Sequence, residues 1–351
     1  MRAMLLLAAL SGCASLDEHI QSLPEADAVE PTWQPAEEPV QGDGFTVRDV
    51  AFPCGDTTCA ASLYLPEGVE RPPVVVMANG FCGQRSAIMP NYAERFAGAG
   101  IAAFALDYRY WGDSGGLPRY DVVAEAQVED YLSGIAHVRT MSAVDGSRLA
   151  VWGTSFSGAH AVTVAARDPE VRALISQVPG LAGAEDHHDL YPKGSLWKLV
   201  RLAFMDKKRL KKGQERIYIT AYGEGEELSF LPRAADKIAQ AGLAPAESEW
   251  PNLVTPGMLL DMDEYHPLQY AKQVTTPALF IIAEQDRYVG NQGAYEAAER
   301  IQKAREKAGL ETTESDVRVE SIDVGHFQFY SGEPFEQTVQ WEIEFLLEEL
   351  S

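Results

Sequence analysis

The stretch Arg148-Leu-Ala-Val-Trp-Gly-Thr-Ser-Phe-Ser-Gly-Ala-His160 decides the fold. Its first half, RLAVW, is a short apolar run that predicts a buried strand. Its second half continues as SGAHAVTVAAR, in which apolar residues recur at helical spacing. Only a tight turn fits between the two, so Ser155 must adopt a strained conformation between small neighbours, Gly153 and Ser157. This turn lifts the Ser155 hydroxyl clear of the backbone and aims the helix N-terminus at it.

Strands and helices alternate along most of the 351 residues. Apolar runs that predict buried strands occupy residues 72–80, 101–107, 148–152, 171–179, 278–286 and 317–322. Helical patterns fall at residues 88–97, 122–139, 157–167, 294–307 and 335–347. This order predicts an α/β fold with a mostly parallel central sheet and helices on both faces. The alternation is interrupted over about 180–270, which predicts an inserted cap.

The turn at Ser155 resembles the nucleophile elbow of the α/β-hydrolase superfamily, G-x-S-x-G. It departs from that pattern at its last position, where Ser157 replaces glycine. Ser157 is a rival nucleophile because it also has small neighbours. The predicted strand ends at Trp152, which places Ser155 at the apex of the turn and Ser157 already in the helix. The resemblance covers residues 45–351 and is weakest in the cap.

In this superfamily an acid and a histidine follow the serine along the chain, on loops after late strands. Here the run ALFIIA leads into Asp286, and the last predicted strand leads into His326. His326 is also the one histidine of seven that lies beyond Asp286. The resemblance therefore implies that Ser155 is the nucleophile, His326 the general base and Asp286 the residue that orients the base. Glu284 is the alternative acid, since it is two residues away.

Two further loops match the superfamily. The turn Asn79-Gly-Phe-Cys-Gly83 resembles its oxyanion turn, which implies the backbone N–H groups of Phe81 and Phe156 as oxyanion donors. Asn79 stands where many relatives have histidine. The run DYRYWGDSGG, residues 107–116, matches the loop after the second parallel strand, and its aromatic residues are candidates for the walls of a substrate pocket. Those candidates are Tyr108, Tyr110 and Trp111.

The N-terminus predicts a membrane-held protein. One arginine, a short apolar run and Leu-Ser-Gly-Cys resemble the lipobox of bacterial lipoproteins, so residues 1–13 are interpreted as a signal that ends at a lipidated Cys13. Residues 14–44 are acidic and proline-rich and predict a disordered tether. The expected location is the bacterial cell envelope, outside the cytoplasm. A net charge of −23 argues against a nucleic-acid partner and against unassisted binding to anionic lipid.

The other cysteines fit an oxidising compartment. Cys54 and Cys59 flank four residues between two strand-like runs, and a hairpin would bring them to bridging distance. The competing interpretation is zinc, but no second pair of ligands with suitable spacing follows, so no metal is expected. Cys82 is left over as a free thiol.

Two stretches of the cap also attract attention. Residues Glu185-Asp-His-His-Asp189 resemble a metal cluster, but adjacent histidines point apart, which favours a solvated loop. The basic amphipathic stretch Lys198–Arg216 is either an exposed cap helix or a surface that rests on anionic headgroups beside a lipid anchor.

The motifs NGFCGQR, DYRYWGDSGG and GTSFSGAH together resemble the branch of Xaa-Pro dipeptidyl-peptidase-like, acetylxylan-esterase-like and polyketide-transferase-like enzymes. That branch implies acyl chemistry through a serine ester with no cofactor. The first hypothesis is a hydrolase of small carboxylic esters. The alternatives are a serine peptidase or amidase, an acyltransferase, and a hydrolase fold retained for binding alone.

Overall fold

The computed structural model describes residues 29–181, 191, 194–225, 227–234, 237–238, 251–310, 313 and 315–351. A nine-stranded sheet runs through this part of the chain in the order β1-β2-β3-β5-β4-β6-β7-β11-β12. Neighbours from β5 to β12 are parallel, whereas β1, β2, β3 and β5 pair antiparallel. The strands are β1 (Val40–Gln41), β2 (Phe45–Cys54), β3 (Thr57–Pro66), β4 (Pro73–Ala78), β5 (Ala102–Leu106), β6 (Asp145–Thr154), β7 (Ala173–Gln177), β11 (Ala278–Ala283) and β12 (Val317–Ile322).

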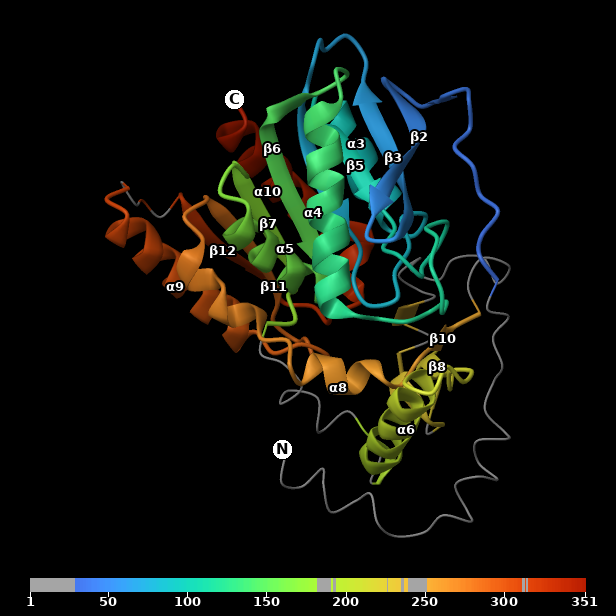
Figure 1. Ribbon diagram of the computed structural model, residues 1–351. Helices are drawn as coiled ribbons and strands as arrows, with labels where there is room; N and C mark the ends of the chain where they lie inside the picture. Colours follow the sequence, from blue (N-terminus) through green and yellow to red (C-terminus); the bar gives the residue numbers. More distant parts are fainter. Residues whose placement is uncertain are drawn as a thin grey trace, which may run out of the picture.

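Helices cover both faces of this sheet (Figure 1). Their bounds are α3 (Met89–Gly98), α4 (Ala124–Thr140), α5 (Phe156–Arg167), α9 (Gln292–Lys307) and α10 (Gly332–Glu349). Helices α3 and α10 contact each other on one face, and α4 and α5 contact each other on the other face. The predicted α/β-hydrolase architecture is confirmed, with each predicted strand and helix within three residues of its expected bounds. Among the described residues, no helix combines the length and apolar character needed to cross a membrane.

The predicted cap is present between β7 and β11. Its described elements are α6 (Ser195–Leu210), α8 (Met258–Met262) and a small sheet in the order β10-β8-β9. The strands of that sheet are β8 (Ile219–Tyr222), β9 (Ser229–Leu231) and β10 (Leu253–Val254). In Figure 1 these elements lie together beyond one end of the central strands. The acidic and histidine-rich run 185–189 lies outside the described residues.

A buried ion-pair network joins the cap to the main domain. The guanidinium of Arg216 contacts the carboxylate of Asp206 on α6 at 2.6 Å and that of Asp121, which precedes α4, at 2.6 Å. All three side chains are at most 5% exposed. Because a charge left alone in such an environment is costly, this pairing fixes α6 against the loop that precedes α4.

The chain before β2 is more ordered than the predicted tether. Within the described residues 29–44, Glu30 accepts a hydrogen bond from the Gly116 N–H at 2.9 Å. The guanidinium of Arg85 lies 5.1 Å from the centre of the Trp33 ring, and β1 pairs with β2. The prediction of disorder as far as residue 44 was therefore too broad. The acidic, proline-rich composition of the segment as a whole predicts disorder, whereas these contacts are made by single residues. Residues 1–28, including Cys13, lie outside the described part.

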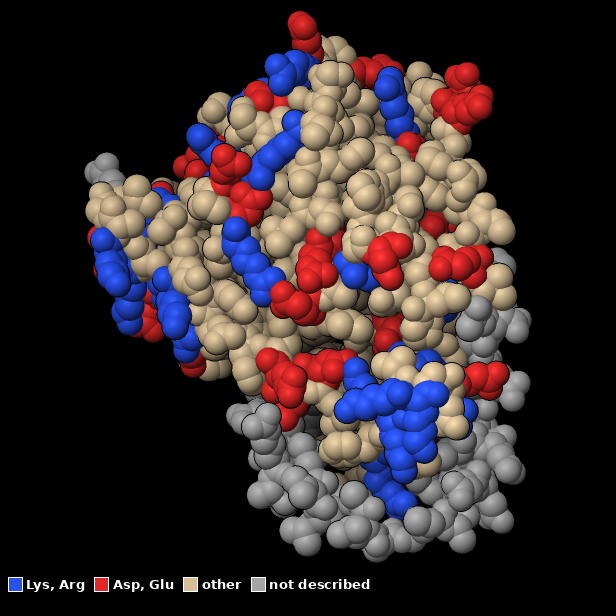
Figure 2. Space-filling view, in the orientation of Figure 1, with Lys and Arg blue, Asp and Glu red and all other residues tan. Residues whose placement is uncertain are grey.

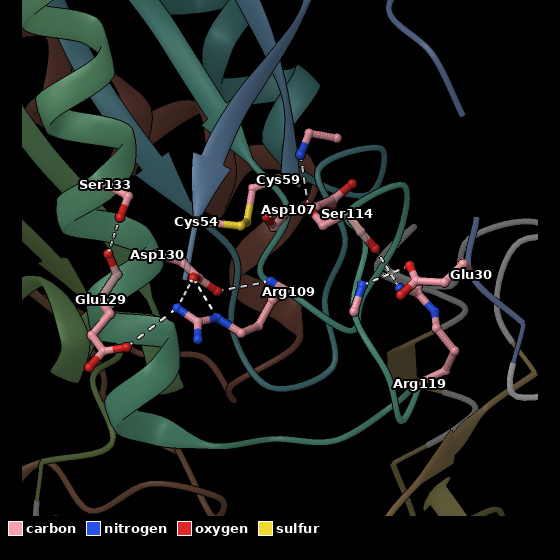
Figure 3. The surroundings of a disulfide bond; sticks show 12 residues. Glu30, Cys54, Cys59, Asp107, Arg109, Ser114, Arg119, Glu129, Asp130 and Ser133 are labelled. Carbon is pink, nitrogen blue, oxygen red and sulfur yellow. Dashed lines mark hydrogen bonds and ion pairs between the residues drawn. A yellow bond between two sulfur atoms is a disulfide. The ribbon is translucent and has the colours of Figure 1, made fainter. Parts of the chain in front are cut away.

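The predicted disulfide between Cys54 and Cys59 is confirmed, and Cys82 is a buried free thiol. The disulfide closes the hairpin between β2 and β3 (Figure 3). Beside it, the guanidinium of Arg109 pairs with the buried carboxylate of Asp130 on α4. The hairpin turn packs on this pair, since a Cβ at Gly55 would lie 2.5 Å from the Arg109 side chain.

A carboxyl group is enclosed behind β6. Glu342 of α10 is fully buried and accepts a hydrogen bond from the indole N–H of Trp152 at 2.9 Å through one oxygen. Its second oxygen has no hydrogen-bond partner among the described residues. Burial raises the pKa of the Glu342 carboxyl well above its usual range, because the charged form loses its hydration.

Replacing this group should change the pH dependence of stability. A carboxyl group whose pKa is raised in the folded state adds stability below its unfolded pKa of about 4.3, and this contribution is lost as the pH rises toward the folded pKa. We expect Glu342→Gln to gain stability relative to the parent by on the order of 1 kcal/mol for each pH unit above that value. Urea unfolding at several pH values between 5 and 8 measures the difference.

The exposed neighbour Glu344 offers the matched control, since it lies on the same helix and is open to solvent. The Glu344→Gln variant should show a flat difference over the same pH range. A flat difference for Glu342→Gln as well would contradict the assignment of a buried neutral carboxyl.

Candidate active site

Ser155 occupies the sharp turn between β6 and α5 that the sequence predicts. Its φ of 55° is the left-handed region that non-glycine residues rarely adopt. Its N–H donates to the carbonyl of Gln177 at 2.8 Å, and its carbonyl accepts from the Gly180 N–H at 3.1 Å. These bonds to the end of β7 hold the turn in place.

Gly153 is what allows the turn to be this tight. A Cβ at Gly153 would lie 2.0 Å from the carbonyl oxygen of Ser157, closer than any side chain tolerates. The first turn of α5 therefore folds back onto the end of β6. The elbow spacing predicted a small residue at 153, and the structure supplies the reason.

Three side chains that are far apart in the sequence meet at this turn. The Nε2 of His326 lies 3.1 Å from the Ser155 hydroxyl oxygen, and its Nδ1 lies 2.6 Å from a carboxylate oxygen of Asp286. The other oxygen of Asp286 accepts from the N–H groups of Tyr288 and Val289 at 2.7 and 3.0 Å. Because a carboxylate only accepts, the proton of a neutral imidazole belongs on Nδ1, which leaves the Nε2 lone pair facing Ser155.

The rival assignments point elsewhere. Glu284 accepts a hydrogen bond from the Ser321 hydroxyl at 2.7 Å on the exposed surface. The Ser157 side chain is 1% exposed and donates to the carbonyl of Asn79, so it is closed to a substrate. His160, one turn along α5, is buried against Gln127 and Tyr265.

The turn at residues 79–83 passes directly over Ser155. A Cβ at Gly80 would lie 2.9 Å from the Ser155 Cβ. The Asn79 side chain braces the turn by accepting from the Gly80 N–H at 2.8 Å and donating to the Gln84 carbonyl at 2.9 Å. Among the described residues, the Phe81 N–H has no protein acceptor. Phe156 is the first residue of α5, so its N–H has no acceptor within the helix.

Cap residues hold this same turn. The Tyr222 hydroxyl on β8 donates to the Phe81 carbonyl, and the Phe230 ring of β9 stacks on the Phe81 ring at 4.5 Å between centroids. Burial raises the pKa of the Tyr222 hydroxyl well above its usual value, so the group stays protonated and able to donate. The sequence carries no signal for this contact, because Tyr222 and Phe81 are 141 positions apart.

A small cavity opens above Ser155, and its walls are mostly apolar. The residues around it come from the turn at residues 79–83, the elbow, the cap and the loops after β7, β11 and β12. They are Phe81, Ser155, Phe156, Gly180, Phe230, Leu231, Met262, Tyr288, Val289 and His326. This arrangement suits an acyl group held against the serine.

The aromatic residues predicted as pocket walls do not line this cavity, so that prediction is corrected. Tyr108 is buried with its hydroxyl 2.8 Å from the Ser157 hydroxyl. Trp111 is buried and donates to the Asp121 carbonyl at 2.7 Å, while Tyr110 packs against Gly116. Their loop is anchored at its start, where the Asp107 carboxylate pairs with the Arg85 guanidinium at 2.6 Å.

The chain is similar to known proteins over most of its length. The family described as "Serine aminopeptidase, S33" matches residues 70–310. The quorum-quenching protein AidA of Acinetobacter baumannii is 31% identical over 85% of this chain and 93% of its own length. The polyketide transferase claH of Penicillium crustosum is 27% identical over 70% of this chain and 78% of its own length.

A solved structure confirms the fold. DcsB, determined in complex with its substrate analogue, superposes with a TM-score of 0.71 at 23% identity and covers 87% of this chain and 99% of its own. The family match and the similarity to AidA agree with two features of the structure, the tight turn at Ser155 and the order of strands in the central sheet. The chain therefore belongs to the S33 serine aminopeptidase family of α/β-hydrolases and is an enzyme of that fold.

Proposed function

We propose that this enzyme hydrolyses a carboxylic ester through an acyl-enzyme on Ser155. The observation that carries the proposal is the continuous contact from the Ser155 hydroxyl through the His326 imidazole to the Asp286 carboxylate. A serine hydroxyl becomes a competent nucleophile when a neutral imidazole removes its proton.

The reaction would proceed in two halves. His326 takes the proton of Ser155 as the hydroxyl oxygen attacks the ester carbonyl, and the N–H groups of Phe81 and Phe156 stabilise the oxyanion. His326 then gives this proton to the leaving alcohol. A water molecule, activated by the same imidazole, hydrolyses the acyl-enzyme and restores the Ser155 hydroxyl. Asp286 keeps the imidazole in the required tautomer and stabilises its positive form.

The cavity favours an ester over a peptide with a free amine. A dipeptidyl-type peptidase needs a carboxylate to bind the substrate amine, and the cap offers Glu224, Glu226 and Glu227 for this role. Glu227 is committed to the N–H groups of Glu224 and Gly225, and Glu224 itself is exposed. Glu226 lies outside the described residues. No acidic side chain belongs to the described walls of the cavity.

Acyl transfer is the second candidate, supported by the similarity to a polyketide transferase. The same acyl-enzyme would serve, with an alcohol or thiol in place of water. The apolar walls around Ser155 suit either outcome.

A fluorophosphonate probe and a substrate panel test the proposal. We expect the probe to label the purified protein and Ser155→Ala to abolish labelling and lower kcat/KM on short nitrophenyl esters by about 10³-fold or more. Ser157→Ala is the matched control and should keep its label. Labelling that survives Ser155→Ala would reject the assignment.

Faster turnover of Xaa-Pro anilides than of esters would favour the peptidase, and product formed only with an added alcohol or thiol would favour the transferase.

The cap contact at the oxyanion turn gives a second test. Tyr222→Phe removes only the hydroxyl that donates to the Phe81 carbonyl, so the turn should be held less firmly. We expect kcat on the best ester to fall by roughly tenfold with a smaller change in KM, because the loss acts on the transition state. The neighbouring Tyr218→Phe loses a hydroxyl directed at the Arg119 carbonyl and should keep kcat within about twofold. Equal kcat values for the two variants would show that Tyr222 does not position the turn.

We also propose that a lipid on Cys13 holds the enzyme in the bacterial cell envelope, outside the cytoplasm. The lipobox-like sequence supports this location, and so does the disulfide, which is typical of oxidising compartments. We expect the Cys13→Ser variant to lose the mass of the lipid and to leave the membrane fraction. Mass spectrometry and fractionation measure both, and an unchanged mass would remove the anchor from the proposal.

A further inference from the structure

Helix α6 carries two large side chains that face solvent. Trp197 and Phe204 are each 43% exposed. The spacing of positions 197, 204, 208 and 211 follows the helical period, which places both aromatic residues on the same side of the helix as Lys208 and the position of Lys211 just beyond its end. Arg201 lies between them on that side. This exposed face combines aromatic and basic residues along its whole length.

The same region gathers positive charge in a chain whose net charge is −23. Seven of its 29 Lys and Arg residues lie between positions 198 and 212, where Asp206 is the only acidic residue. Figure 2 shows these side chains as a basic cluster over α6. In the described part of the chain, Lys208, Lys211 and Lys212 form no ion pair with a carboxylate.

The orientation of the helix is fixed from its other side. Leu199, Leu202 and Ala203 are buried against the rest of the cap. Asp206 receives the Arg216 guanidinium, and Lys207 pairs with Asp261 of α8. Because these contacts prevent α6 from turning about its axis, the aromatic and basic face is presented outward permanently.

We propose that this face, called the α6 platform and defined by Trp197, Phe204, Lys208, Lys211 and Lys212, docks on a bilayer surface rich in anionic phospholipid. Trp and Phe side chains enter the boundary between headgroups and acyl chains, while Lys and Arg extend toward the phosphates. Each basic residue near such a surface strengthens binding by roughly fivefold. A second copy of the chain does not suit the platform, since two such faces repel each other.

The net negative charge of the whole chain opposes binding to anionic lipid. Binding depends more strongly on the charges that lie close to the bilayer. Charges farther from the bilayer than about 8 Å are largely screened at physiological ionic strength. The acidic residues of the main domain therefore count less than the platform, and their repulsion favours the orientation in which α6 faces the lipid. Docking would hold the cap against the bilayer, with Met262 of the adjacent α8 in the wall of the cavity.

Co-flotation with vesicles tests the proposal independently of catalysis. The full chain with Cys13→Ser, which has no site for a lipid, is mixed with vesicles of phosphatidylcholine alone or of equal parts phosphatidylcholine and phosphatidylglycerol. We expect binding to the anionic vesicles that weakens with added salt, and weaker binding to the neutral ones. Trp197→Ser with Phe204→Ser, and separately Lys208→Gln with Lys211→Gln and Lys212→Gln, should each lower the binding by about tenfold or more.

Matched changes elsewhere on the surface control for general effects. Tyr295→Ser with Leu347→Ser removes two exposed apolar side chains, and Lys303→Gln with Lys307→Gln removes charge from α9. These variants should float like the parent. Equal flotation of parent and platform variants would overturn the proposal. Binding of a DNA duplex that needs the lysines but tolerates loss of the two aromatic residues, with no preference for anionic vesicles, would overturn it in favour of a phosphate-binding surface.

Discussion

The structure depends on one tight contact between the end of a strand and the start of a helix. The carbonyl oxygen of Ser157 lies 2.0 Å from where a Cβ at position 153 would be, which excludes every residue but glycine, and Ser155 between them has a positive φ of 55°. This contact sets where α5 begins and therefore where the Phe156 N–H points. It also brings Gly80 against the serine, so the turn at residues 79–83 and the Ser155 side chain are positioned together. Backbone strain at such a position persists because the surrounding sheet and helix determine it fully.

The central fold could be read from sequence because its signals are local. Strands β4, β5 and β11 are continuous apolar runs, and a strand buried on both faces favours that composition. The site was predicted from the resemblance to the α/β-hydrolase superfamily, in which an acid and a histidine follow the serine along the chain. The topology supplies the physical reason: parallel strands end at one edge of a sheet, so residues just after β6, β11 and β12 converge. The structure brings Ser155, Asp286 and His326 together as the resemblance implies, and their catalytic roles stay a prediction.

The cavity could not be read in this way, because its walls come from elements with no common pattern. Met262 and Phe230 belong to a cap whose short strands carry weak periodicity, and Gly180 and Val289 are loop residues. The aromatic residues after β5 were predicted as pocket walls because their loop matches one in the superfamily, whereas in the structure Tyr108 and Trp111 are buried and take no part in the cavity. The same limit explains residues 29–44. Their average composition predicts disorder, but single contacts such as Arg85 with Trp33 hold the segment to the domain.

The link made by Arg216 has a consequence for how the enzyme admits its substrate. A hinged lid that swung away from the sheet would have to separate Arg216 from Asp121 and break this buried ion pair. Substrate would then enter a cavity whose described walls are already in place. Substrate selectivity would depend on the shape of these walls. Substitutions of residues in the walls should therefore alter substrate preference more readily than substitutions that loosen the cap.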